Sequence, residues 1–150
     1  MSICRIVSVD RQLTAIVKAS VPFAEIPAAR RSARSKVDAA LPSLDAAPIG
    51  RSLTRFCTPS DGRLDMEMGS IVARPFAATG DVVPSDLPAG RAAHFQLKGS
   101  FEGMQGAWQT LFDWCKAEKL SLAGINWEIY SPWDGVDPTT LDTDLYALLA

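Results

Sequence analysis

One carboxylate among aromatic rings is the most chemically suggestive feature of this sequence. Glu128 lies in the segment 124–133, which also contains Trp127, Tyr130 and Trp133. Aromatic faces stack on flat cations with a gain of about 0.5 to 2 kcal/mol each, and a carboxylate supplies the opposite charge. This combination of residue types is therefore typical of a site for an aromatic or cationic small molecule.

The position of Glu128 in a predicted strand determines which neighbours share its surroundings. Side chains alternate between the two faces of a strand. Asn126, Glu128 and Tyr130 are therefore expected on one face, and Trp127 and Ile129 on the other. If the first face is buried, the carboxylate needs a partner, since an unpaired buried charge costs several kcal/mol or takes up a proton.

Two interpretations of Glu128 follow from that requirement. The acid is either an anchor for the positive charge of a ligand, or a structural acid bonded to Tyr130, His94 or a nearby arginine. The supply of aromatic side chains favours the anchor. The sequence alone leaves both open.

Composition excludes several classes of chemistry. His94 is the only histidine, so a multi-histidine zinc site is excluded and catalysis through a histidine would have to use this residue. Its place on a predicted strand favours a solvated or structural role. Cys4, Cys57 and Cys115 are far apart, which fits neither a disulfide framework nor a metal-binding motif. We expect no metal, no cofactor and a cytoplasmic location.

Charge is unevenly distributed along the chain. Residues 1–60 hold nine Lys and Arg against four Asp and Glu, whereas residues 61–150 hold six against thirteen. An acidic half does not suit nucleic acid, so direct DNA or RNA binding is not expected. Four basic residues fall in one predicted helix, where a solvated face is favoured over a phosphate-binding one: Arg30, Arg31, Arg34 and Lys36.

The hydrophobic pattern predicts a duplicated α+β fold. The predicted strands are 48–57, 64–72, 91–98, 126–131 and 143–149, with one or two more in 3–20 as a hairpin or a bent strand. Helices are predicted over 26–41, where Pro42 ends the helix, and over 102–119. Breaks or loops are predicted over 83–90 and 132–138. The order is strand, helix, strand, strand, twice. We therefore expect one domain over 1–150, with pseudo-repeats 1–75 and 76–150, an antiparallel sheet, two main helices and a ligand cleft between the halves.

Further aromatic and thioether side chains are candidates for that cleft. Trp108 and Phe112 lie on the apolar stripe of the second helix, Phe95 on the strand before it, and Met68 on an alternating strand beside Met66. Packing in the core is the alternative use of each of them. No segment approaches the roughly 20 apolar residues of a membrane helix, and no signal peptide is expected at the start.

Several short motifs in a fixed order point to a known family. In order, they are Asp65-Met-Glu-Met-Gly69, Leu87-Pro-Ala-Gly90, Lys98-Gly-Ser-Phe-Glu102, Ala107-Trp108 through Trp114, Glu128-Ile-Tyr130 and Thr143-Asp-Leu145. Together they resemble the GyrI-like small-molecule-binding domain family, which includes the effector-binding domains of AraC-type and MerR-type regulators. The pattern departs from the family at Ser100 and Phe101, where proline and tyrosine are common.

The resemblance implies a ligand class and a site. It implies lipophilic, often cationic or polycyclic aromatic ligands in a cleft between the halves, with Glu128 as the pocket carboxylate and Trp108 as an aromatic wall. We expect a stand-alone multidrug-type binder without a DNA-binding domain, using Glu128, Trp108, Tyr130, Trp133, Phe112, Phe95 and Met68. The alternatives that the resemblance implies are a hydrolase of reactive cyclopropane-bearing xenobiotics, with Glu128 as general base, and a protein-interaction module of the gyrase-inhibitor kind.

Overall fold

Two helices and eight strands make up the described part of the computed structural model, which covers residues 3–57, 61–99, 101–131 and 142–150. Helix α1 spans Ile26–Leu44 and helix α2 spans Met104–Ala117. Each follows a short 3-10 turn, η1 at Phe23–Glu25 and η2 at Phe101–Gly103. Pro27 occupies the first turn of α1, where the proline nitrogen needs no hydrogen-bond partner.

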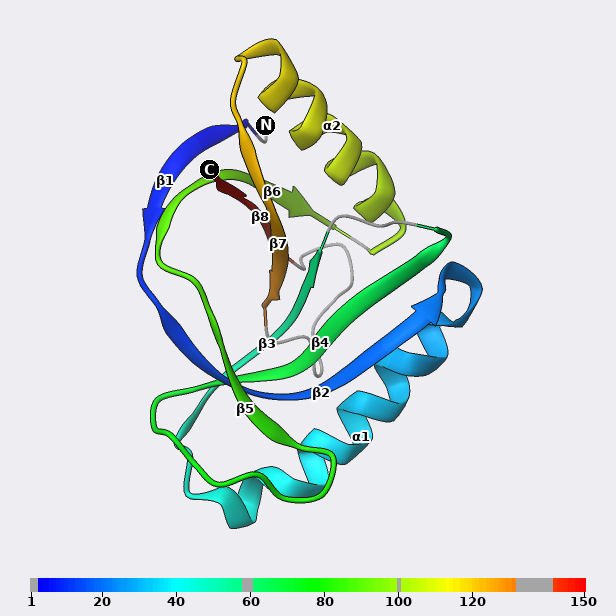
Figure 1. Ribbon diagram of the computed structural model, residues 1–150, viewed down its shortest axis with the longest axis vertical. Helices are drawn as coiled ribbons and strands as arrows, with labels where there is room; N and C mark the ends of the chain where they lie inside the picture. The colour runs from blue at the N-terminus through cyan, green and yellow to red at the C-terminus, as the bar shows by residue number, and fades with distance from the viewer. Residues whose placement is uncertain (1–2, 58–60, 100, 132–141) are drawn as a thin grey trace.

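All eight strands belong to one antiparallel sheet that curls into a half-barrel (Figure 1). They are β1 (Arg5–Val9), β2 (Gln12–Pro22), β3 (Pro48–Cys57), β4 (Arg63–Val72), β5 (Val83–Leu87), β6 (Gly90–Lys98), β7 (Leu122–Tyr130) and β8 (Asp142–Leu149). Their order across the sheet is β1-β6-β8-β7-β3-β4-β2-β5. The adjacent strands β3 and β7 therefore form the centre, with three more strands on each side.

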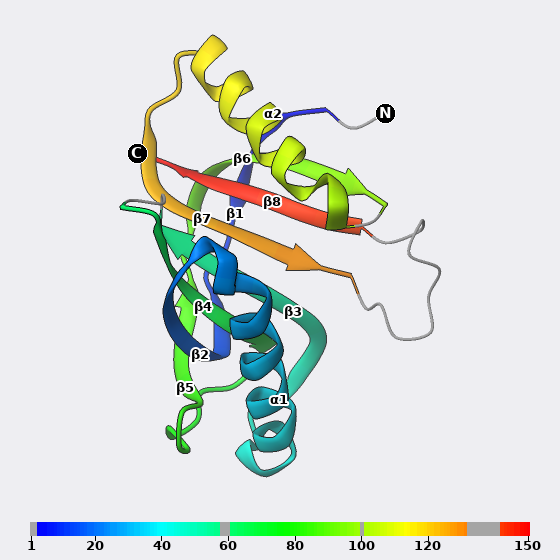
Figure 2. The same cartoon turned by 90° about the vertical axis from the view of Figure 1, so that its right-hand side faces the viewer.

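Both helices lie on the same face of the sheet, each over a different part of it, and the central strands run between them (Figure 2). Helix α1 packs on β2 and β4 through Ala33 and Val37, and α2 packs on β6 and β8 through Leu111 and Cys115. A third apolar cluster, which includes Trp127, contains neither helix. The central strands β3 and β7, which lie between the two helices, are one of the places where the two halves of the chain meet.

The outer strands are exchanged between the two halves of the chain. The first half runs β1-β2-α1-β3-β4 and the second runs β5-β6-α2-β7-β8. However, β1 pairs with β6 of the second half, and β5 pairs with β2 of the first. Each half therefore completes the sheet of the other.

The predicted fold class is confirmed: the chain is α+β, with two strand-helix-strand-strand units in one antiparallel sheet. The segment 3–20 contains two strands, β1 and most of β2. They do not pair with each other as a hairpin, because β1 pairs with β6 and β2 pairs with β4. Helix α2 is shorter than the predicted 102–119. The predicted loop 132–138 lies outside the described residues.

Two predicted boundaries are wrong for reasons that lie in tertiary packing. Pro42 does not end the first helix, which continues to Leu44 and places Leu41 and Leu44 against the core. That contact offsets the hydrogen bond that a proline cannot make. The predicted break 83–90 contains strand β5, in which Pro84 is tolerated because β5 lies at the edge of the sheet.

Candidate functional site

Glu128 is a buried carboxylate at the centre of the sheet. It lies on β7 opposite Thr54 of β3, and its side chain is only 3% exposed. Trp108 donates to Oε2 at 2.6 Å, and Tyr130 donates to Oε1 at 2.5 Å. Arg30 of helix α1 reaches the same Oε1 at 3.3 Å. The carboxylate thus binds donors from both helices and from its own strand.

Trp108 connects the two halves of the apolar core. Its ring stacks on Phe112 at a centroid distance of 5.3 Å and meets the edge of Phe56 at 5.2 Å. It packs against the clusters beneath both α1 and α2. With its ring held by two neighbours, the indole N–H is directed at Glu128, so Trp108 positions the carboxylate.

Tyr130 remains a neutral hydrogen-bond donor. Burial and the negative charge of Glu128 raise the pKa of the phenol well above its ordinary value. Its hydroxyl also lies 2.7 Å from Oγ1 of Thr54. For Arg30, burial alone would lower the pKa, but its electrostatic and hydrogen-bond interactions with Tyr130 and Glu128 outweigh that effect and raise it. Arg30 therefore stays positively charged beside the acid.

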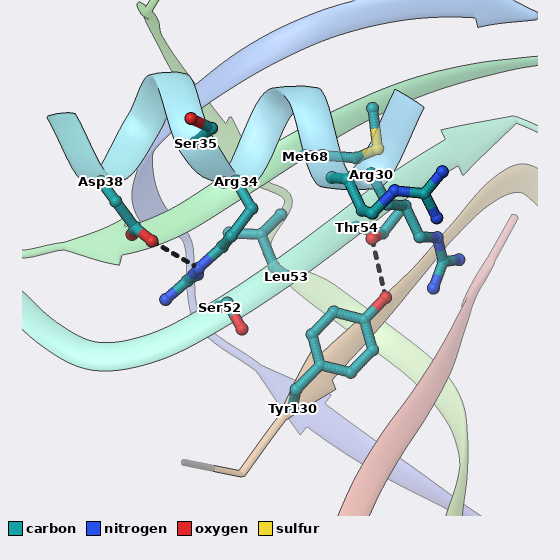
Figure 3. Close-up of a pocket in the computed structure, with 11 residues that line it drawn as sticks. Arg30, Arg34, Ser35, Asp38, Ser52, Leu53, Thr54, Met68 and Tyr130 are labelled. Atoms are coloured by element: carbon teal, nitrogen blue, oxygen red, sulfur yellow. Dashed lines mark hydrogen bonds and ion pairs between the residues drawn. The ribbon is translucent and has the colours of Figure 1, made fainter. Parts of the chain in front are cut away.

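A cavity of about 560 Å³ lies between helix α1 and the central strands (Figure 3). Ser52, Leu53 and Thr54 of β3 line it, together with Met68 and Gly69 of β4 and Tyr130 of β7. Five residues of α1 line it as well: Arg30, Arg31, Arg34, Ser35 and Asp38. This volume is that of a pocket for a drug-sized molecule. Because Arg30 and Tyr130 line the cavity and also bond Glu128, the carboxylate lies directly behind its wall.

The structure brings together most of the residues that the sequence singled out. Met68 and Tyr130 line the cavity, and both Tyr130 and Trp108 donate hydrogen bonds to Glu128. Two others lie elsewhere: Phe112 stacks on Trp108, and Phe95 packs beneath α2. Trp133 lies outside the described residues.

Arg30 is the residue that the sequence-based prediction of the site missed. The basic residues of this helix are predicted to form a solvated face, yet three of them line the cavity. Arg30 and Arg34 are four residues apart and directly follow Ala29 and Ala33, which pack toward the core. That spacing places the arginines at the border of the buried stripe, where long side chains can reach inward.

His94 lies on strand β6, does not line the cavity and has a structural role. It is buried, and its Nε2 lies 2.9 Å from Oδ1 of Asp144 while Arg5 donates to its Nδ1 at 3.4 Å. The expectation of a solvated histidine is therefore wrong, and that of a structural one is confirmed by these bonds. Burial would raise the pKa of Asp144, but its bonds and charges with His94 and Arg51 outweigh burial and lower it.

The lowered pKa of Asp144 predicts a pH-dependent contribution to stability. A carboxyl whose pKa is lower in the folded state stabilises above its unfolded pKa of about 3.9 and loses that contribution as pH falls through the folded value. Asp144→Asn should lower the free energy of unfolding by about 1.5 kcal/mol at pH 7 and by clearly less at pH 3. Urea unfolding at both pH values measures this difference.

The control is Asp142→Asn, because Asp142 is on the same strand but is 39% exposed and lies 3.4 Å from Lys98. An exposed pair contributes less than about 1 kcal/mol. An equal loss for Asp144→Asn at both pH values would contradict the proposed linkage.

A comparison with known families decides the relationship that the motifs suggested. Residues 4–150 match the family described as the GyrI-like small molecule binding domain. This chain is a GyrI-like domain. A search of curated proteins found no match. The family is one of small-molecule binding, so the cavity beside Glu128 in this GyrI-like domain is the candidate binding site.

Solved structures share the fold of this GyrI-like domain at low sequence identity. The EcmrR C-terminal domain aligns with a TM-score of 0.80 and 14% identity, over 100% of this chain and 98% of that one. SAV2435, solved bound to tetraphenylphosphonium, aligns with a TM-score of 0.71 and 9% identity, over 98% and 93%. A hydrolase from Listeria innocua aligns with a TM-score of 0.58 and 11% identity, over 98% and 91%. At these identities the likeness establishes the fold.

Two further properties of the described residues bear on function. Neither helix of this GyrI-like domain has the length and apolar character needed to cross a membrane. No group of three or more His, Cys, Asp and Glu side chains gathers within the described part of the chain in a way that could hold a metal ion.

Proposed function

We propose that this GyrI-like domain binds hydrophobic aromatic cations in the cavity between helix α1 and strands β3, β4 and β7, with Glu128 as the anionic anchor. The supporting observation is that Tyr130 and Arg30, which line the cavity, both bond Oε1 of Glu128. A ligand cation that takes the place of the Arg30 guanidinium gains access to that oxygen. Tyr130 and Trp108 then hold the carboxylate in position.

The chemistry of the cavity suits a large apolar ligand with one charge. Met68 and Leu53 supply apolar surface, and the methylene stems of the arginines can cover apolar parts of a ligand. The charge of Arg34 is balanced by Asp38 at 3.1 Å. Burial of a ligand in this cavity would strengthen its attraction to Glu128, because water no longer screens the charges.

Paired ions of opposite charge test the proposal. Tetraphenylphosphonium and tetraphenylborate have nearly the same shape, so a difference in their affinities reports the charge preference of the site. We expect tetraphenylphosphonium to quench tryptophan fluorescence and to bind at least about tenfold more tightly than tetraphenylborate. Glu128→Gln should weaken the cation by about tenfold, which is 1.4 kcal/mol, because the side chain keeps its shape and loses its charge.

The control variant is Asp38→Asn, which removes a carboxylate that also lines the cavity but is half-exposed and paired with Arg34. This change should alter the affinity less than about threefold, because exposed pairs contribute little. Equal affinities for the two ions, or cation binding that is unchanged in Glu128→Gln, would refute Glu128 as the anchor. Tighter binding of tetraphenylborate would reassign the site to anions.

The geometry favours binding over the hydrolase alternative. A general base needs an oxygen directed at the water or proton that it accepts. In Glu128, Oε2 accepts from Trp108 and Oε1 from Tyr130 and Arg30, so both oxygens are engaged by the protein until Arg30 is displaced, and the displacing cation then occupies the position that a water would need. For the gyrase-inhibitor alternative, no observation on the described residues specifies a partner surface. Both stay predictions from the resemblance.

A further inference from the structure

We propose that Arg30 is an internal cation that competes with the ligand for Glu128 and so sets the affinity and charge selectivity of the site. This inference rests on the proposed function, because it assumes that ligands reach Glu128 from the cavity. It adds that a ligand binds only by displacing the charged side chain of Arg30 from the carboxylate of Glu128.

Arg30 is the group that balances the charge of Glu128. The two other donors, Trp108 and Tyr130, are neutral, and among the described residues Arg30 is the only cation within ion-pair distance of this acid. Burying a carboxylate without any opposite charge costs several kcal/mol. A charged Glu128 in the folded chain is therefore stabilised by a cation at this position, supplied either by Arg30 or by a ligand.

The contact of Arg30 is the weakest of the three on Glu128. It consists of one hydrogen bond at 3.3 Å from Nη2, and the buried Nε of Arg30 has no partner among the described residues. Strong arginine–carboxylate pairs use two parallel bonds at about 2.7 to 2.9 Å. The neutral donors are closer, at 2.5 and 2.6 Å. Ligand binding is therefore expected to exchange Arg30 and to leave Trp108 and Tyr130 in place.

The guanidinium of Arg30 can move into solvent when a ligand displaces it. Its side chain is 37% exposed, whereas that of Glu128 is 3% exposed. Because Arg30 starts from helix α1 and lines the cavity, a change in its side-chain torsions moves the guanidinium into water without moving the helix. The displaced charge is then hydrated, which limits the cost of exchange. When a ligand occupies the cavity, Arg30 then lies at its rim.

Competition makes a specific prediction for variants of Arg30. In Arg30→Met the ligand no longer displaces a protein cation, so tetraphenylphosphonium should bind about tenfold more tightly than to the unaltered chain. The ligand-free variant should unfold at a lower temperature, because Glu128 has lost its counter-charge, and the cation should raise that temperature by more than in the unaltered chain. Fluorescence titration and thermal unfolding measure both effects.

Arg31→Met is the matched control. Arg31 lines the same cavity from the same helix, and within the described residues it forms no ion pair. Its removal changes the net charge of the cavity by the same amount but leaves the contact with Glu128 intact. We expect a change in cation affinity of less than about threefold. Equal gains in the Arg30 and Arg31 variants would overturn competition in favour of general electrostatics.

A second variant keeps the test valid if Arg30→Met does not fold. Arg30→Gln retains a donor for Glu128 without its charge, and it should also bind the cation more tightly, whereas Arg30→Lys should stay near the unaltered affinity. A cation that binds the unaltered chain through Glu128 but no more tightly after Arg30→Gln would overturn competition and leave the proposed function standing. Absence of cation binding in all these proteins would overturn both.

Discussion

Gly69→Ala is expected to lower the free energy of unfolding by about 3 kcal/mol or more. A Cβ at this position would lie 1.9 Å from the backbone oxygen of Ala15 and 2.8 Å from Cα of Ile16. Both atoms belong to strand β2, which pairs with β4 at this point, so relief requires the strands to separate. Overpacking against side chains costs about 1 to 3 kcal/mol, and backbone relaxes less readily than side chains.

Gly106→Ala provides the comparison. Gly106 lies in helix α2, and a Cβ there has open space around it. Alanine should stabilise the chain by about 0.5 to 1 kcal/mol, because it costs less conformational entropy in a helix than glycine. Chemical denaturation of the two variants tests the contrast. A loss below about 1 kcal/mol for Gly69→Ala would mean that β2 and β4 can part easily.

Trp127→Ala is expected to cost about 3 to 5 kcal/mol in stability while leaving ligand affinity unchanged. Trp127 is 2% exposed and stacks on Tyr146 at a centroid distance of 5.3 Å. It is adjacent to Glu128 in the chain but packs in the cluster on the other side of the sheet. The variant should therefore lose core packing without losing a contact to the cavity.

Trp127→Phe serves as the control for this prediction, since it keeps an aromatic ring against Tyr146 and should lose clearly less stability than the alanine variant. Denaturant unfolding gives the stability, and titration with tetraphenylphosphonium under conditions where both variants are folded gives the affinity. A weaker cation affinity in folded Trp127→Ala would contradict the independence of the two faces.

Local patterns predicted the arrangement of β7 well. The alternation of side chains in a strand separates Glu128 and Tyr130 from Trp127 and Ile129, and the structure keeps that separation. Such a prediction needs only the geometry of one strand. Both helices were predictable for the same kind of reason, because the apolar stripe of each helix is visible as a local pattern in the sequence.

Contacts between distant segments were not predictable in the same way. Arg30 and Glu128 are 98 positions apart, and nothing in the spacing of either residue identifies the other. The sequence allowed Glu128 an arginine, tyrosine or histidine partner; the structure supplies Arg30, Tyr130 and also Trp108, whereas His94 bonds Asp144. Tertiary pairing likewise turned Pro84 from a breaker into part of an edge strand.

The exchange of outer strands has a consequence for how the chain reaches this structure. Strand β1 is made first during synthesis, but its partner β6 begins at Gly90, and Arg5 finds His94 only across 89 positions. Closing so long a loop is entropically costly, and folds dominated by such pairings form slowly. Neither half has all its hydrogen-bonding partners before the other is present. The halves are therefore expected to become ordered together in one late, cooperative step. Tyr130, which the second half contributes to the cavity, takes its place only then.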